Sequence, residues 1–363
     1  MNPSISNIIN EGNELKFTLA GTNVSLANAI RRVVLSDIPV TVIDGDNSDI
    51  TANTSRLHNE ILKHRLGCIP VHMTDLEMLP GKYMLEINKE NTNEPIEYVT
   101  TEDFRIKNIE TKNYITAEEQ KRIFPVNSIT NMYIDFTRLR AGIGNHVPGE
   151  KLQLTADFVV KSAADNSMYN IVSSCSYGNT MDPIKINEVW GEHSNKLKAE
   201  GLTESEIEMQ KKNFYILDAQ RHFIEDCFDF TVNSIGIYEN AYIIRKACEV
   251  LEKRFADLIL AADSDILPIR ISEVTMDHSY DIVLENEDYT IGKVLEYVLY
   301  EQFFKNEGIL KYCGFKKFHP HNDESIIRLA YYNNAADKTM VAQNIRMACS
   351  LSIDYFAKVR KMF

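Results

Sequence analysis

Apolar residues follow the same pattern in two segments near the two ends of the chain. In residues 15–19 they alternate with other residues, and after residue 25 they recur every three or four positions. The same change occurs between residues 280–284 and the stretch after residue 290, at a constant offset of 265 positions (280 − 15). Alternation is typical of a half-buried strand, and the longer spacing is typical of an amphipathic helix. Each segment is therefore predicted to be a strand that leads into a helix.

Residue types that commonly cap helices occur at both positions where the strand pattern changes to the helix pattern. Asn23 and Ser25 occupy the first change, and Asp288 and Thr290 occupy the second. Their side chains can accept hydrogen bonds from the free N–H groups of a first helical turn. This agreement predicts two related domains within one polypeptide.

A second pair of segments repeats with a different offset. Phe228-x-Phe230 precedes a helical pattern over residues 238–262, and Leu329-x-Tyr331 precedes another that starts near Val341. These segments lie 101 positions apart (329 − 228), so the first copy holds 164 additional residues (265 − 101) between its two strand-helix units. An insertion of that length has the size of a domain. We expect the N-terminal domain to be interrupted by an inserted domain.

Both long helical patterns have a single apolar face. Because two such faces are best buried against each other, we expect the two domains to pair within the chain. The residues predicted to form this intramolecular pairing surface are Leu26, Ile30, Val34, Ile244, Cys248, Leu251, Phe255, Ile291, Leu295, Ile345, Ala348, Tyr355 and Phe356.

The inserted region differs in character from the flanking segments. Residues 52–66 are predicted to be helical, and residues 83–176 contain short alternating segments separated by turn residues, which indicates strands. A charged helix is expected to begin at Thr203, because Glu206 completes a capping box. The predicted fold is α+β, with a discontinuous first domain (1–45 and 213–263), a β-rich insert that includes the charged helix (46–212) and a last domain (264–363).

Composition narrows the classes of function. The chain has 363 residues, of which 44% are hydrophobic, and its 39 basic and 52 acidic residues give a net charge of −13. This charge argues against a broad surface for nucleic acid or anionic membranes. The N-terminus lacks the pattern of a signal peptide, and no apolar run is long enough to span a bilayer. We expect a soluble, intracellular protein.

Candidate catalytic and metal sites are few. The six cysteines are widely separated, and the only cluster that resembles a metal site combines Cys313 with His319 and His321. An alternating strand explains this spacing equally well, and a fourth ligand is missing. Gly142-Ile143-Gly144 lacks the third glycine of a dinucleotide-binding loop. We therefore expect no catalytic residue, metal or cofactor.

Two adjacent arginines, Arg31 and Arg32, stand in an otherwise apolar helical tract. They can compensate the helix dipole and cover the core with their aliphatic stems. Alternatively, one guanidinium can reach a carboxylate on a partner protein, a role that suits the planar fork of arginine. The residues alone leave both interpretations open.

Several motifs together resemble the third-largest subunit of eukaryotic RNA polymerase II, the counterpart of the bacterial alpha subunit. They are SLANAIRRV at 25–33, IP at 38–39, ID at 43–44, NTS at 53–55, HRLGCIP at 64–70 and PGEKLQL at 148–154. From about Ile266 the chain is similar to the eleventh subunit of the same enzyme, through EDYTIGKVL at 287–295, CGFK at 313–316 and HP at 319–320. The resemblance covers nearly the whole chain.

The resemblance implies an assembly platform in which two normally separate, heterodimerising subunits are fused. Such a platform holds the largest and second-largest polymerase subunits and small polymerase subunits, and it makes little direct contact with DNA. It also implies that Arg32, together with Arg31, His64 and Arg65, contacts a large subunit. The cysteine cluster that binds zinc in the eukaryotic insert, and the iron–sulfur site of some archaeal relatives, have no counterpart between Asp44 and Ser176.

The fused form is similar to polymerases of large double-stranded DNA viruses. That similarity implies a location with the transcription machinery, either in the nucleus or, for a virus, in a cytoplasmic factory and the virion. Two other functions stay open, a transcription accessory factor that uses the subunit fold and a stand-alone enzyme centred on the insert.

Overall fold

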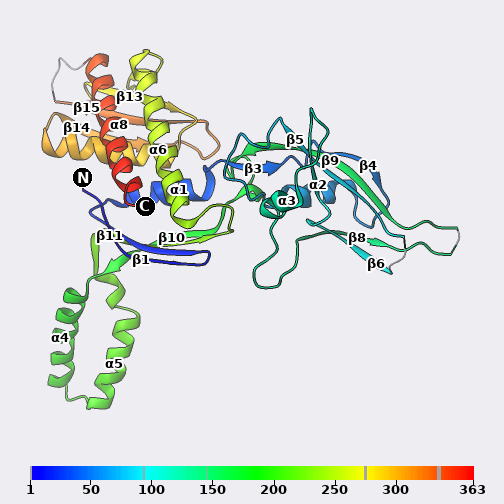
Figure 1. Cartoon of the computed structure of the whole chain (residues 1–363). Helices are drawn as coiled ribbons and strands as arrows, with labels where there is room; N and C mark the ends of the chain where they lie inside the picture. The colour runs from blue at the N-terminus through cyan, green and yellow to red at the C-terminus, as the bar shows by residue number, and fades with distance from the viewer. Residues whose placement is uncertain (1, 93–94, 145, 274–275, 333–336) are drawn as a thin grey trace. The chain divides into compact units, whose positions relative to one another are not determined.

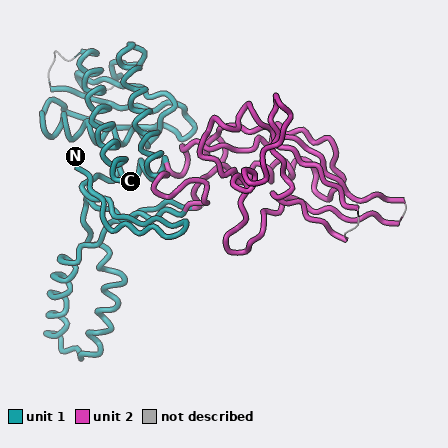
Figure 2. The backbone as a smooth tube through the Cα atoms, viewed as in Figure 1, with its two compact units in different colours: residues 1–33, 174–233, 244–363 teal, residues 34–173, 234–243 magenta. Residues whose placement is uncertain are grey.

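The computed structural model describes residues 2–92, 95–144, 146–273, 276–332 and 337–363. The chain has an α+β fold with several antiparallel sheets, and it forms two compact units (Figure 2). Unit 1 contains residues 1–33, 174–233 and 244–363, and unit 2 contains residues 34–173 and 234–243. Each unit is thus assembled from segments that are distant in the sequence.

The first sheet of unit 1 has four strands in the order β1–β2–β11–β10 (Figure 1). Their bounds are Ser4–Glu11 (β1), Glu14–Ala20 (β2), Phe223–Ser234 (β11) and Val172–Met181 (β10). β2 and β11 are antiparallel, with Phe17 opposite Phe230, and their rings stack at a centroid distance of 4.9 Å. The predicted strand at residues 15–19 is confirmed, and helix α1 (Val24–Ser36) follows it.

The second sheet of unit 1 has the order β12–β13–β15–β14. Its strands are Ile269–Ile271 (β12), Ser279–Glu285 (β13), Glu324–Tyr331 (β15) and Leu310–Lys316 (β14). Helix α7 (Tyr289–Leu299) follows β13 and continues into a π-helical segment (Tyr300–Asn306). The two long helices expected from the apolar pattern are α6 (Asn240–Asp263) and α8 (Lys338–Arg360).

The strand register corrects one detail of the repeated pattern. Phe230 lies opposite Phe17, and the residue opposite Ile282, which is 265 positions after Phe17, is Ile327. The corresponding strand positions therefore differ by 97 (327 − 230) and not by 101. The two offsets differ by four, which is an even number. A shift by an even number of residues keeps each apolar side chain on the same face of the sheet, so the apolar pattern alone could not reveal this shift.

Unit 2 is the β-rich part of the chain. Its larger sheet has the order β3–β9–β5–β7, with β4 also paired to β9, and β6 pairs with β8 in a separate two-stranded ribbon. The strands are Val40–Ile43 (β3), Asp49–Asn53 (β4), Tyr83–Glu90 (β5), Ile96–Thr100 (β6), Arg105–Asn108 (β7), Asp135–Arg140 (β8) and Lys151–Lys161 (β9). Short helices α2 (Asn59–Gly67) and α3 (Ala117–Ile123) accompany these strands, and an apolar core fills the unit.

The helix predicted over residues 52–66 is shorter than expected. Residues 49–53 form β4, and the helix begins only at Asn59. The side chain of Asn53 accepts a hydrogen bond from the N–H of Ser55 at 3.0 Å and donates one to the carbonyl of Leu57 at 2.8 Å. This local turn competes with helix formation and delays the start of α2.

A helical hairpin joins β10 to β11. It consists of α4 (Pro183–Ala199) and α5 (Glu204–Ile216), which project together from the sheet of unit 1 (Figure 1). The predicted capping box is confirmed, because Thr203 accepts from the N–H of Glu206 and the Glu206 carboxylate accepts from the N–H of Thr203. Helix α4 was not predicted, because its apolar positions are sparse.

The division into units differs from the boundaries drawn on the sequence. The hairpin was expected in the insert, but it belongs to unit 1 because it connects neighbouring strands of that unit. The segment 264–363 was expected as a separate domain, but it shares unit 1 with the N-terminal strands. Unit 2 begins at residue 34, before β3, because β3 pairs with β9.

Candidate functional site

The candidate site is the surface along which the two sheet-helix halves of unit 1 pair. Helices α6 and α8 lie side by side and run antiparallel (Figure 1). Arg346 near the start of α8 pairs with Asp263 at the end of α6, whereas Arg360 at the end of α8 pairs with Glu252 in the middle of α6. Ion pairs on opposite ends of α8 thus set the direction and the register of the helices.

Two phenylalanine rings mark the centre of this surface. Phe255 of α6 and Phe356 of α8 stack at a centroid distance of 6.0 Å with an interplanar angle of 12°, and both side chains are fully buried. Their positions differ by 101 (356 − 255), the offset that relates the two helical patterns. Each ring therefore contacts its own counterpart, which is the geometry expected on a two-fold axis.

A second pair of contacts obeys the same offsets. Arg254 of α6 binds the carboxylate of Glu287, which precedes α7, with an Nε–Oε1 distance of 3.2 Å. Tyr355 of α8 donates its hydroxyl hydrogen to Thr22, which precedes α1. Tyr355 is 101 positions after Arg254, and Glu287 is 265 positions after Thr22. A contact between a long helix and the residues just before a short helix thus occurs twice. The groups are charged in Arg254 with Glu287 and neutral in Tyr355 with Thr22.

Arg32 joins the two halves at the N-terminus of α7. Its Nε donates to the hydroxyl of Thr290 at 2.8 Å, and its Nη2 binds the carboxylate of Asp288, the N-cap residue of α7. The Asp288 carboxylate also accepts from the N–H of Thr290 at 2.8 Å. Burial opposes ionisation of this group, but the hydrogen bonds from Thr290 and the Arg32 guanidinium hold the pKa of Asp288 below its ordinary value.

The ion pairs between α6 and α8 differ in exposure: the Arg346 and Asp263 side chains are each 45% exposed, whereas Arg360 Nε and Glu252 Oε1 are buried. Arg360 Nε lies 3.0 Å from Glu252 Oε1, but the two groups are not aligned as a hydrogen bond. Burial raises the pKa of Glu252, although the Arg360 guanidinium opposes this shift. The exposed Arg346–Asp263 pair contributes little net stability, and the attraction between Arg360 and Glu252 is offset by the loss of hydration of their buried atoms, so the buried rings contribute more to the pairing energy than these charges.

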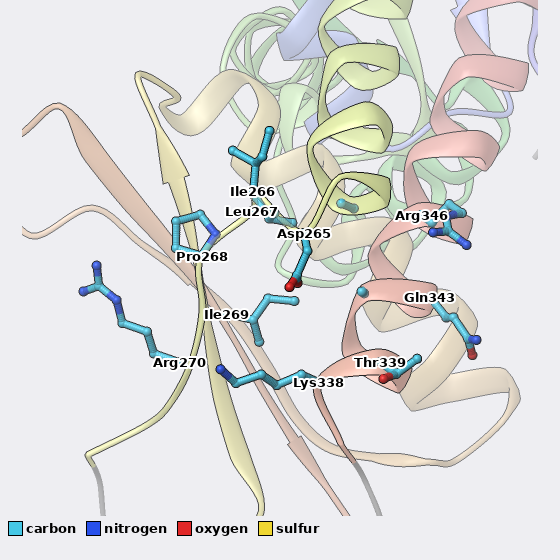
Figure 3. A pocket seen from close by; sticks show the side chains of 12 residues that line it. Asp265, Ile266, Leu267, Pro268, Ile269, Arg270, Lys338, Thr339, Gln343 and Arg346 are labelled. Atoms are coloured by element: carbon cyan, nitrogen blue, oxygen red, sulfur yellow. The ribbon is translucent and has the colours of Figure 1, made fainter.

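The two halves are joined by a short, ordered connection. Only residues 264–268 separate α6 from β12, and the N–H groups of Ile266 and Leu267 both donate to the carbonyl of Ala261, at 3.0 and 3.1 Å. The connection and the start of α8 line a cavity of about 420 Å³ (Figure 3). Leu267 is buried and Pro268 accepts from the N–H of Val283 at 2.9 Å, so the connection forms part of the folded unit.

All thirteen residues predicted for the pairing surface are buried. Among them, Phe255, Phe356 and Tyr355 make the specific contacts described above. Three residues of the surface were not predicted, namely Arg254, Glu287 and Thr22. The two offsets were the signal that could have found them, because they relate Arg254 to Tyr355 and Thr22 to Glu287.

The four candidate contacts to a large subunit lie in different surroundings. Arg31 Nε donates to Asn28 at 2.9 Å, and Arg32 is engaged with Asp288 and Thr290. In unit 2, His64 is exposed, and Arg65 donates to the carbonyls of Asp135 and Phe136, each at 2.8 Å. Their contact with another subunit stays a prediction.

Neither a metal site nor a membrane span is found in the described ranges. In these ranges, no three His, Cys, Asp or Glu side chains gather in a way that could hold a metal ion. Within the predicted cluster, the Cys313 thiol approaches the carbonyl of Glu296 at 3.6 Å, while His319 accepts from the N–H of His321 at 3.1 Å. No described helix has both the length and the apolar character needed to cross a bilayer.

Comparison with known proteins gives a consistent family match. The model of the RNA polymerase Rpb3/Rpb11 dimerisation domain matches residues 16–255, which include α1, β11 and most of β2 and α6. The chain is 22% identical over 298 residues to human DNA-directed RNA polymerases I and III subunit RPAC1, covering 70% of this chain and 83% of the relative.

Shorter matches have higher identity. The chain is 41% identical over 68 residues to DNA-directed RNA polymerase II subunit RPB3 of Schizosaccharomyces pombe, which covers 19% of this chain and 22% of the relative. It is 46% identical over 66 residues to DNA-directed RNA polymerase subunit Rpo3 of Pyrobaculum aerophilum, which covers 18% of this chain and 24% of the relative.

Proposed function

Because the chain belongs to the RNA polymerase Rpb3/Rpb11 dimerisation domain family, we propose that it is an assembly platform whose two pairing partners are fused in one polypeptide. It is a non-catalytic Rpb3-like subunit of a DNA-directed RNA polymerase. The first partner corresponds to β1, β2, α1, β10, β11 and α6. The second, which resembles the eleventh polymerase subunit, corresponds to the segment from β12 to α8.

The observation that carries this proposal is the set of equivalent contacts in unit 1. Phe255 meets Phe356 on the axis, and Arg254 with Glu287 has an equivalent in Tyr355 with Thr22. Equivalent contacts that occur in pairs across an interface are typical of an isologous arrangement, as in a symmetric dimer. Such repeated contacts support an origin by duplication and a heterodimer-like pairing within one chain.

The covalent connection makes the pairing intramolecular. The second partner is always present at a high effective concentration, so pairing needs no encounter between two chains. We propose that the paired unit then binds the largest and second-largest polymerase subunits and small polymerase subunits, with His64 and Arg65 among the contacts. Arg31 and Arg32 are further candidate contacts to a large subunit, and Arg32 also joins α1 to the N-terminus of α7 through Asp288 and Thr290. Relationship to the fused form of large DNA viruses stays a prediction.

The decisive experiment is affinity purification of the tagged full-length chain from cells that express it naturally. We expect both large polymerase subunits in stoichiometric amounts, and we expect Phe356→Asp to abolish their recovery because it places a charge in the buried centre of the pairing surface. Ile216→Asp introduces the same charge at a side chain that is 64% exposed and should leave recovery unchanged.

Recovery of the wild-type chain as a free monomer without large subunits would contradict the proposal. Tight, salt-dependent binding of the isolated chain to DNA, again without large subunits, would favour a transcription accessory factor instead.

A further inference from the structure

A positively charged groove of unit 2 lies beside the β6–β8 ribbon. Four of the nine residues that line it are arginines, and the groove has a volume of about 410 Å³. The lining residues are Arg56, Leu57, Arg65, Ile96, Asp135, Phe136, Thr137, Arg138 and Arg140. This concentration of guanidinium groups contrasts with the net charge of −13 of the whole chain.

The strand register places two of these arginines beside exposed apolar side chains. Ile96 lies opposite Arg140 and Tyr98 lies opposite Arg138, so the four side chains share one face of the ribbon. Ile96 is 51% exposed and Tyr98 is 44% exposed, and the Arg138 guanidinium lies 5.0 Å from the centre of the Tyr98 ring. Arginine and tyrosine are among the residues enriched at the energetic centres of protein interfaces.

The charge of the groove is only partly compensated. Arg140 is paired with Glu150, whose carboxylate also accepts from the backbone N–H of Arg140 at 2.8 Å. Burial opposes ionisation of Glu150, but the bonds from Arg140 hold the pKa of this carboxyl below its ordinary value. With Asp135 and Glu150 counted against the four arginines, an excess of two positive charges remains (4 − 2).

Arg65 is held in position by neutral groups. Its guanidinium donates to the carbonyls of Phe136 and Asp135, both at 2.8 Å. Carbonyl oxygens fix the orientation of the side chain without neutralising its charge. The groove therefore presents a preorganised cation, a second cation stacked on an aromatic ring and apolar side chains between them.

We propose that this groove binds an acidic peptide segment of a partner protein, in which carboxylates alternate with apolar side chains. The carboxylates would pair with Arg56, Arg65 and Arg138, while the apolar side chains would cover Ile96 and Leu57. Arginine binds carboxylates in a planar, two-pronged geometry, which suits this role. The proposal concerns unit 2 alone and does not depend on the pairing described for unit 1.

Nucleic acid is the other polyanion that a cluster of arginines could attract. Binding to nucleic acid draws on many phosphate contacts over a broad basic surface, whereas this cationic region is confined to one groove that also exposes apolar side chains. The acidic balance of the chain further disfavours a long polyanion. The charge and the apolar lining together favour a short acidic peptide.

Fluorescence anisotropy with the purified full-length chain tests this proposal. The probes are a short labelled peptide that alternates glutamate with leucine, its counterpart with lysine in place of glutamate, and a labelled single-stranded oligonucleotide. We expect the glutamate peptide to bind most tightly, with an affinity that falls as salt is added, because these charges are solvent-accessible.

Charge reversal at the groove provides the matched comparison. The double variant Arg56→Glu and Arg138→Glu should weaken binding of the glutamate peptide by about a factor of ten or more, since each substitution removes a charge-assisted contact. Both side chains are exposed, so the fold should persist, and circular dichroism checks this. Arg221→Glu makes the same change at a side chain that is 80% exposed on unit 1 and should leave the affinity unchanged.

Three results would overturn the proposal. They are equal binding of the glutamate and lysine peptides, stronger binding of the oligonucleotide, and an equal loss of affinity in Arg221→Glu. Because the double variant changes neither the α6–α8 surface nor His64 and Arg65, it should still recover the large polymerase subunits, so failure here is distinguishable from failure of the assembly function.

Discussion

Single residues in unit 1 combine a local role with a role in pairing. Asp288 accepts from the N–H of Thr290 as the cap of α7, and its carboxylate also binds Arg32 of α1. Asn23 stands at the equivalent position and accepts from the N–H of Ser25 at 2.9 Å. An amide is sufficient to cap a helix, but only a carboxylate can also form an ion pair with arginine. The second cap is a carboxylate and not an amide because it also binds Arg32, which is distant in the sequence.

The contact between Phe255 and Phe356 can be tested with a double-mutant cycle. Each replacement by leucine retains most of the apolar volume and should lower the free energy of unfolding by about 1 kcal/mol. The two effects should be non-additive by about 0.5–1.5 kcal/mol, because either change removes the same ring contact. Chemical denaturation followed by circular dichroism measures both quantities. Pairing Phe255→Leu with Phe104→Leu, a buried residue of unit 2, provides the control and should give additive effects.

At the scale of elements, the α4–α5 hairpin differs from the rest of unit 1. Its own core consists of Ile186, Phe214 and Ala219, with Val189 and Trp190 packed against it. The Trp190 ring lies 5.4 Å from that of Phe214. A core of this size buries little apolar surface, so the hairpin is stabilised mainly by capping and by its attachment to β10 and β11.

This small core predicts an early unfolding transition. Trp190 is the only tryptophan in the chain, so tryptophan fluorescence reports on the hairpin alone. During urea denaturation, we expect its fluorescence to change at a lower concentration than the circular dichroism signal of the whole chain, since local stability follows local burial. Coincident transitions would show that the hairpin unfolds together with the sheet. Phe214→Leu should shift the fluorescence transition further and leave the main transition in place.

At the scale of the whole molecule, the short connection at residues 264–268 decides how the halves meet. Its N–H groups are bonded to the end of α6, and Asp265 adopts a left-handed conformation with φ of 54° just after the helix. Asp tolerates this conformation better than most residues and thereby ends α6. The chain then enters β12 directly, so both halves fold into one unit.

Cutting the connection tests whether pairing depends on it. If residues 264–268 are replaced by a protease site, cleavage of the folded protein should leave the two fragments associated, because the buried contacts persist. Dissociation on dilution should become measurable by size-exclusion chromatography, since the covalent link no longer supplies a high effective concentration. Arg254→Ala should shift dissociation to higher concentrations, whereas Lys253→Ala, at an exposed neighbouring position, should not. If the two fragments separate immediately after cleavage, even at high protein concentration, then the covalent link and not the buried surface holds the halves together.

Much of the fold was predictable because it depends on local patterns. The strand at 15–19, the helices α1, α6, α7 and α8, and the capping box at Thr203 follow from residue spacing over one or a few turns. The late start of α2 was missed because the Asn53 turn and the pairing of β4 with β9 override helical propensity. Helix α4 was missed because its apolar spacing is weak.

The candidate site was predictable in outline and not in its contacts. Apolar spacing identified which faces of α6 and α8 are buried, and the offset of 101 predicts that the two helices are equivalent. The groove beside β6 and β8 could not be predicted, because Arg56, Arg65, Arg138 and Arg140 come from separate segments and meet only through the pairing of those strands and the position of α2.

The sequence by itself determined the strands, the helices and their long apolar faces, and it predicted the repeat and the insertion, because period and spacing are properties of neighbouring residues. Only the tertiary structure decided the strand offset of 97, the engagement of Arg32 by Asp288 and the division into units. A shift of four residues leaves every side chain on the same face of a strand, so only hydrogen-bonded partners can define the register. Likewise, an arginine can serve a helix end, a core or a partner, and only the position of a carboxylate across the fold selects among them.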